Sequence, residues 1–183
     1  MPMAVEDICK LYVRDPAKVA NCNEFLQAIA EKVGAENGLN LREAFAGNAN
    51  TIRGRFNTQT STGPPFIYIG PFPDKATQYA ADGQFVIGGL TQTEMTYVGR
   101  DNREHKSTMG HVVVVVPGGP SKQVPVKLAD GTLQPVRGGY PYCYQGAAHA
   151  LYRFKERTQV DAVFPGLLLT RVIYAYIDLK KRK

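Results

Sequence analysis

Apolar residues near the start of the chain recur with the spacing of helices. The pattern predicts a short helix over residues 4–13, ended at Asp15–Pro16 because proline cannot continue a helix. A longer pattern, with apolar residues at i, i+3, i+4 and i+7, predicts an amphipathic helix over residues 22–33. A further short helix is expected within residues 42–56.

The second of these helices has recognisable ends. Asn21 is of a type that caps helix N-termini, and Glu24 stands where a capping box places its acidic residue. Gly34 is a candidate C-terminal stop. These boundaries put Cys22 in the first helical turn.

The second half of the chain has mainly the pattern of strands. Five consecutive valines follow His111, and a run without polar alternation predicts a strand covered on both faces. Strands are predicted at Phe66–Ile69, Gln84–Ile87, His111–Val116, Tyr140–Tyr144 and Arg171–Ile177, with a hairpin turning at Asp130–Gly131. Because helices precede strands instead of alternating with them, the sequence predicts an α+β fold.

Two segments interrupt this pattern. Residues 57–75 contain four prolines and are expected to be irregular apart from their short strand. Residues 91–109 are polar and contain both signs of charge, which predicts a long loop or a hairpin.

Length and composition are those of an ordinary globular protein. Of the 183 residues, 44% are hydrophobic and 21% charged, and we expect one domain over residues 1–183. The N-terminus lacks the basic start and apolar run of a signal peptide, and no apolar run approaches the ~20 residues of a membrane helix. The sequence therefore predicts a protein made in the cytoplasm without a signal peptide and without a membrane span.

The chain is basic, with a formal net charge of +6. Such a charge suits an anionic partner. The basic residues are scattered apart from those of residues 179–183, which read as a frayed tail, and no nucleic-acid-binding motif accompanies them. We therefore expect no nucleic-acid binding.

The three cysteines, Cys9, Cys22 and Cys143, include no CxxC pair. This argues against a zinc site built from cysteines, and three cysteines cannot all pair within one chain. No metal or other cofactor is predicted.

Cys22 and His111 are the candidate catalytic pair. A thiol in the first turn of a helix meets the positive end of the helix dipole and free amides, which favour the nucleophilic thiolate. The backbone amide of Cys22 is a candidate oxyanion donor. His111 opens the most buried predicted strand, after Gly110, which allows another group to approach closely. His105, in the polar segment, and His149 compete weakly with it.

Gln145 is the candidate third group, because its amide oxygen can accept the Nδ1–H of His111 from a neighbouring strand. Ordinary structural roles stay open for all three residues: Cys22 as a core residue of its helix, His111 as a strand-end residue and Gln145 as a surface residue. Cys143 is expected on the strand face of Gln145, either as a neighbour of the substrate-binding site or as a core thiol.

These residues resemble the NlpC-type papain-like cell-wall peptidases, and among them the type VI secretion amidase effectors, which are peptidoglycan DL-endopeptidases. The resembling stretches are Asn21–Gly34 (NCNEFLQAIAEKVG), Gly47–Ile52 (GNANTI), Gly83–Leu90 (GQFVIGGL), Gly110–Pro120 (GHVVVVVPGGP) and Tyr140–Gly146 (YPYCYQG). The cysteine helix together with GHVVVVV is the most specific part of this resemblance.

The resemblance implies a papain-like fold, in which the N-terminal cysteine-bearing helix packs on an antiparallel sheet. It implies that Cys22 is the nucleophile, that His111 is the base and that Gln145 orients the base. The implied reaction is hydrolysis of the peptidoglycan stem peptide between D-glutamate and meso-diaminopimelate, through a thioester on Cys22.

The resemblance also implies a setting. Such an antibacterial effector is injected into the periplasm of a rival cell, acts as a monomer without a cofactor, and is blocked by a periplasmic immunity protein of the producer. Residues 57–80 and 91–109 look longer than in the compact members, and insertions there border the entrance to the active site. Two alternatives stay open: another thiol hydrolase or acyltransferase on the same fold, and a non-catalytic binding module for anionic polymers.

Overall fold

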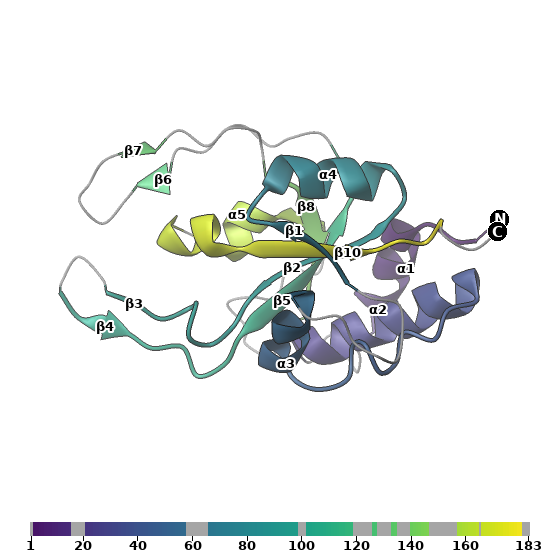
Figure 1. Cartoon of the computed structure of the whole chain (residues 1–183), viewed down its shortest axis with the longest axis horizontal. Coiled ribbons are helices and arrows are strands. Elements are labelled where there is room, and N and C mark those ends of the chain that lie inside the picture. Colours follow the sequence, from purple (N-terminus) through teal and green to yellow (C-terminus); the bar gives the residue numbers. More distant parts are fainter. Residues whose placement is uncertain are drawn as a thin grey trace.

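The computed structural model describes residues 2–15, 21–57, 66–98, 102–118, 126–127, 133–134, 140–146, 157–164 and 166–180. Their centre is a six-stranded antiparallel sheet in the order β1-β10-β2-β5-β8-β9 (Figure 1). The strands are β1 (Ile67–Gly70), β2 (Phe85–Leu90), β5 (His111–Val116), β8 (Tyr142–Tyr144), β9 (Thr158–Gln159) and β10 (Ile173–Ile177). Two further antiparallel pairs lie beyond one end of the sheet: β3 (Tyr97–Val98) with β4 (Glu104–His105), and β6 (Val126–Lys127) with β7 (Leu133–Gln134).

Helices cover both faces of this sheet (Figure 1). The first face is covered by α1 (Val5–Tyr12), α2 (Cys22–Asn37), α3 (Ala49–Gly54) and the short 3-10 helix η1 (Arg55–Asn57). The second is covered by α4 (Pro73–Ala81), α5 (Val160–Val163) and the 3-10 helix η3 (Gly166–Arg171). The predicted α+β class is confirmed.

Strand β5 lies inside the sheet between β2 and β8 and supplies side chains to both hydrophobic layers. Val112, Val114 and Val116 pack with α1, α2 and α3, whereas Val113 and Val115 pack with α4, α5 and η3. All five valines are buried. The prediction of a strand covered on both faces is therefore confirmed.

Helix α2 begins at Cys22 after the N-cap residue Asn21, as predicted, but its C-terminal end differs from the prediction. The helix continues through Gly34 to Asn37 and ends at Gly38, which has a left-handed φ of 65°. The side chain of Asn21 makes no capping hydrogen bond. Gly34 is explained by the chain beyond the helix, because a Cβ there would lie 2.5 Å from the carbonyl oxygen of Leu39.

The bounds of two other predicted segments also differ in the structure. Strand β2 continues beyond Ile87 through Gly88 and Gly89 to Leu90. Glycine fits at both positions because the ring of Tyr174 and the carbonyl of His111 occupy the space that side chains would need. In residues 57–75 the predicted strand is present as the edge strand β1, but the segment does not stay irregular to its end, because α4 begins at Pro73. This proline lies in the first turn, where a missing N–H costs nothing. Pro73 is thus compatible with the helix.

Some predictions concern other parts of the chain. The polar segment 91–109 contains the hairpin of β3 and β4, as predicted. Asp130–Gly131 and His149 lie outside the described residues. Within the described ranges, none of the helices has the length and apolar character of a membrane span.

The two helical glycines Gly34 and Gly54 form a matched pair for a stability test. We expect Gly34→Ala to lower the free energy of unfolding by about 1–3 kcal/mol, because the new methyl group meets the Leu39 carbonyl. Gly54→Ala should be neutral or stabilising by up to about 1 kcal/mol, because nothing lies within 4 Å of its Cβ position. Urea unfolding of both variants measures the difference, and equal effects would contradict the close approach of Leu39.

Candidate active site

His111 is held at the end of the β2–β5 pair, where it lies opposite Leu90 in the register. Gly110 precedes it, and a Cβ at this glycine would lie 2.5 Å from Oδ1 of Asn50 and 2.6 Å from the carbonyl oxygen of Leu90. The close approach predicted at this glycine is confirmed. Asn50 of α3 and Leu90 of β2 therefore pack closely against the backbone that enters β5.

Cys22 begins α2, which packs on β5, and shares the hydrophobic layer of Val112. The backbone N–H groups of Val112, Asn23 and Cys22 itself act on the thiol and lower its pKa. Val112 is bonded to His111 through the peptide group that bears its N–H. The thiol thus lies against the peptide between these two strand residues, with helix N-terminal amides facing it.

The thiol of Cys22 is neutral at rest. Only 7% of the residue is exposed, and this burial raises the pKa of the thiol above its ordinary value of 9.0. The three amides lower the pKa, but their effect is smaller than that of burial. The amides of the first helical turn thus favour the thiolate, as expected, but burial outweighs them.

Gln145 follows β8 and is buried, with 2% of its surface exposed. Its Oε1 is hydrogen-bonded to Nε2 of the His111 ring. The surface alternative for this residue is therefore wrong, and the predicted bond to Nδ1 is replaced by one to Nε2. Because an amide oxygen only accepts hydrogen bonds, Nε2 bears the proton and Nδ1 is the basic nitrogen.

Close packing holds Gln145 beside the cysteine helix. A Cβ at the next residue, Gly146, would lie 2.6 Å from the carbonyl oxygen of Asn21 and 2.6 Å from Cβ of Phe25. The backbone leaving β8 therefore passes directly against the first turn of α2. This contact joins the segments of Cys22 and Gln145, which are far apart in the sequence.

The imidazole of His111 is also neutral at rest. Burial lowers its pKa from the ordinary value of 6.5, and the hydrogen bond that Nε2 donates to Gln145 opposes this effect only in part. The edge of the ring meets Phe164, at a centroid distance of 5.5 Å. The pair therefore rests as thiol and neutral imidazole.

The remaining candidates lie apart from this arrangement. All three cysteines are within the described residues, and each is a free thiol. Cys143 is fully buried in the hydrophobic layer opposite that of Cys22, and burial raises its pKa strongly, so the structure favours the core-thiol alternative. Cys9 is buried beside α2, and His105 is exposed on β4. In the described part of the chain, no group of three or more His, Cys, Asp and Glu side chains is suited to hold a metal ion.

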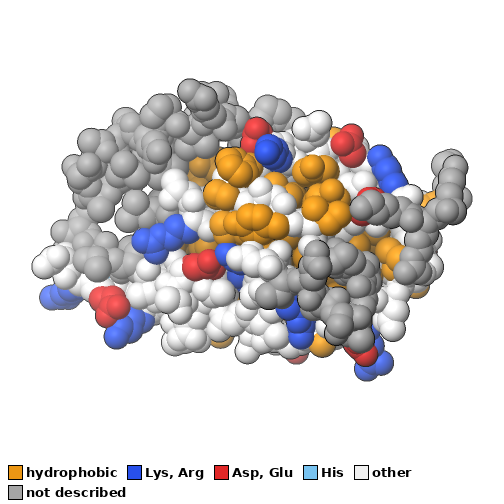
Figure 2. Space-filling view, viewed as in Figure 1, with side chains coloured by type: hydrophobic (Ala, Val, Ile, Leu, Met, Phe, Trp, Pro, Cys, Tyr) orange, Lys and Arg blue, Asp and Glu red, His pale blue; other side chains and the backbone are white. Residues whose placement is uncertain are grey.

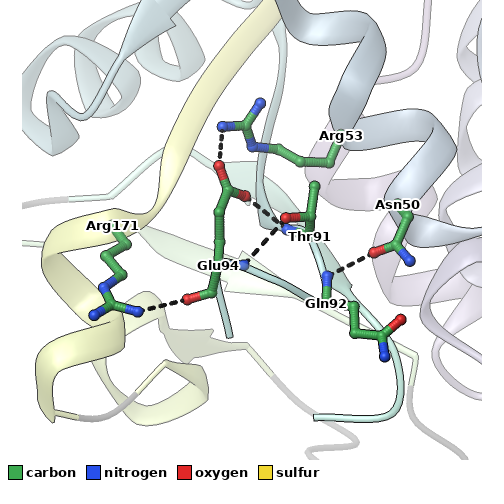
Figure 3. A network of polar contacts seen from close by, with 6 residues as sticks. All are labelled: Asn50, Arg53, Thr91, Gln92, Glu94 and Arg171. Atoms are coloured by element: carbon green, nitrogen blue, oxygen red, sulfur yellow. Dashed lines mark hydrogen bonds and ion pairs between the residues drawn. The ribbon is translucent and has the colours of Figure 1, made fainter. Parts of the chain in front are cut away.

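Sequence reasoning missed a polar network beside Gly110. It joins α3, the turn after β2 and the end of η3, through Asn50, Arg53, Thr91, Gln92, Glu94 and Arg171 (Figure 3). The available signal was the spacing of Thr91 and Glu94, three residues apart as in a capping box. No sequence pattern indicated their partners on α3 and η3.

Comparisons with known proteins give no further identification. No model of a known protein family matches the sequence, and no curated protein is significantly similar to it. Inferences about function therefore rest on the residues and the geometry given above.

We expect Gln145→Leu to lower the pKa of His111 further. Leucine keeps the position buried but removes the hydrogen bond that raises this pKa, so desolvation acts unopposed. An NMR titration of the ring measures the shift. Gln84→Leu is the matched control, because Gln84 is a buried glutamine bonded to the amide of Leu179 at the opposite end of β2. An unchanged or raised His111 pKa in Gln145→Leu would contradict the assigned bond.

Proposed function

We propose that the protein is a cysteine-dependent amidase with a papain-like, NlpC-type architecture. The observation that supports this most is the joint placement of three groups. They are the thiol of Cys22 at a helix N-terminus, the imidazole of His111 next to Val112, whose amide acts on that thiol, and the Gln145 amide oxygen that accepts a hydrogen bond from Nε2. A nucleophile, a base and a group that orients the base are the groups used in amide hydrolysis by a cysteine nucleophile.

The proposed reaction starts from the neutral pair. As Sγ of Cys22 attacks the amide carbonyl, its proton passes to Nδ1 of His111, and the resulting imidazolium donates through Nε2 to Gln145. Backbone amides at the start of α2 stabilise the oxyanion. Nδ1–H then protonates the leaving amine, which departs and leaves a thioester on Cys22. A water molecule, deprotonated by His111, hydrolyses this thioester and restores the thiol.

Peptidoglycan is the proposed substrate, with the stem peptide bond between D-glutamate and meso-diaminopimelate as the scissile bond. The resemblance of the cysteine helix and GHVVVVV to the type VI amidase effectors supports it, and the net charge of +6 suits an anionic cell wall. The corresponding setting is injection into the periplasm of a target bacterium, with an immunity protein as the partner that blocks the site.

One observation favours a second candidate, the non-catalytic binding module. Cys22 is buried and its pKa is raised, as for a core thiol without a chemical role. The hydrogen bond between His111 and a buried Gln145 argues for the enzyme, because a partly buried imidazole whose tautomer is fixed is prepared to act as a general base. Another thiol hydrolase on the same fold has the same geometry and differs only in substrate.

We expect purified protein to release cleaved muropeptides from Gram-negative sacculi, and Cys22→Ala to abolish the release. Cys9→Ala, which alters another buried thiol in the same hydrophobic layer, is the control and should retain activity when folded. Mass spectrometry of the soluble products identifies the bond cleaved. Intact sacculi would contradict the peptidoglycan substrate, and cleavage by Cys22→Ala would contradict the nucleophile.

The neutral resting pair predicts the pH dependence of activity. Activity requires neutral His111, and because its pKa lies below 6.5, activity should fall only as the pH drops below that value. The raised thiol pKa predicts that alkylation of Cys22 by iodoacetamide accelerates continuously up to pH 9.0 and beyond. Rates of alkylation measured from pH 5 to 10 test this. A plateau reached below pH 7 would indicate a preformed ion pair and contradict the prediction.

A further inference from the structure

The chain that joins β2 to β5 begins with one isolated helical turn, from Thr91 to Met95, where the amide of Met95 donates to the carbonyl of Thr91. Its start is capped reciprocally: the Thr91 amide donates to Oε2 of Glu94 at 2.7 Å, and the Glu94 amide donates to Oγ1 of Thr91 at 3.2 Å. At its end, Arg171 donates to the carbonyl oxygens of Glu94 and Thr96. The turn is therefore closed by side chains at both ends.

Helix α3 fixes this turn from the other side (Figure 3). Arg53 is buried, and its Nη2 lies 2.7 Å from Oε1 of Glu94. One helical turn earlier, Oδ1 of Asn50 accepts a hydrogen bond of 2.6 Å from the amide of Gln92. Charge pairing and a backbone contact thus attach the turn after β2 to α3.

Asn50 also meets the other strand of the pair. The same Oδ1 would lie 2.5 Å from a Cβ on Gly110, so the Asn50 amide group packs directly on the backbone that enters β5. The next residue is His111, which begins β5 and pairs with Leu90 at the end of β2. One side chain therefore contacts both the segment leaving β2 and the segment that leads to the proposed base.

We propose that Asn50 is a positioning residue for His111, an inference that rests on the proposed function. Gln145 fixes the ring at Nε2, whereas Asn50 fixes the backbone from which the ring extends. Both are needed because a ring held only at its far end can move with its backbone relative to Cys22. General-base transfer is sensitive to displacements of about 1 Å, which can cost about 100-fold in rate.

The test compares three single variants of the full-length protein. Asn50→Ala removes the acceptor, Asn50→Asp keeps an acceptor oxygen, and Asn48→Ala is the control. Asn48 caps the same helix through the amide of Thr51 at 3.0 Å but has no bond to Gln92. If Asn50→Ala does not fold, Asn50→Leu, which retains volume without an acceptor, takes its place.

For sacculus cleavage we expect Asn50→Ala to lower kcat by about 10- to 100-fold with KM nearly unchanged, since the loss concerns alignment and not binding. Asn50→Asp should recover most of kcat, and Asn48→Ala should remain close to the unaltered protein. Equal losses in Asn50→Ala and Asn48→Ala, or no recovery with aspartate, would overturn the proposal.

A measurement without substrate separates this proposal from the proposed function. The NMR titration of His111 should give a pKa closer to the ordinary 6.5 and broadened ring signals in Asn50→Ala, but unchanged values in Asn48→Ala. Unaltered protein that leaves sacculi intact while Asn50→Ala shifts this titration would refute the substrate and support the positioning role. An unshifted titration in Asn50→Ala would refute the positioning role whatever the substrate.

Discussion

Strand β5 has valines on both faces, and because neither face can remain in water, helices have to cover the sheet on both sides. Each buried valine contributes about 1.5–3 kcal/mol, so this strand is a large part of the core. The two layers meet at its first residues. The layer of α2 brings Cys22 to the Val112 amide, and the opposite layer brings Phe164 to the ring of His111. The candidate site is thus the polar end of the most apolar strand. Elsewhere, on the side of the molecule where α4 lies, a patch of hydrophobic side chains is visible at the surface (Figure 2).

Burial at this strand end determines the chemistry proposed for the site. It raises the pKa of Cys22 and lowers that of His111, so both groups rest uncharged. Gln145 suits such surroundings, because a carboxylate at a position exposed by only 2% would lose hydration worth several kcal/mol and would raise the pKa of the imidazole. A neutral orienting residue fixes the tautomer without introducing a buried charge. The proposed enzyme would then generate its thiolate only as the proton moves to His111.

The sequence was most informative where pattern and packing agree. Helical spacing located α2, and an uninterrupted valine run located β5 and its burial on both faces. Prediction failed where a glycine serves close packing and does not end its element: Gly34 makes room for the Leu39 carbonyl inside a helix, and Gly88 makes room for the Tyr174 ring inside a strand. In the site, residue types identified the candidates Cys22, His111 and Gln145. Their protonation and the nitrogen that Gln145 contacts depend on burial and ring orientation, which one-dimensional spacing does not contain.

The central claim is that Cys22 becomes acylated during turnover, with His111 as its base. The most direct measurement is mass spectrometry of protein acid-quenched within milliseconds to seconds of mixing with a purified muropeptide. We expect a transient adduct, with the mass of the acyl portion of the stem peptide, on the tryptic peptide that contains Cys22, and none when His111 is replaced by Ala. Cleaved muropeptide without any adduct on Cys22, or with the adduct on Cys9 or Cys143, would contradict the account.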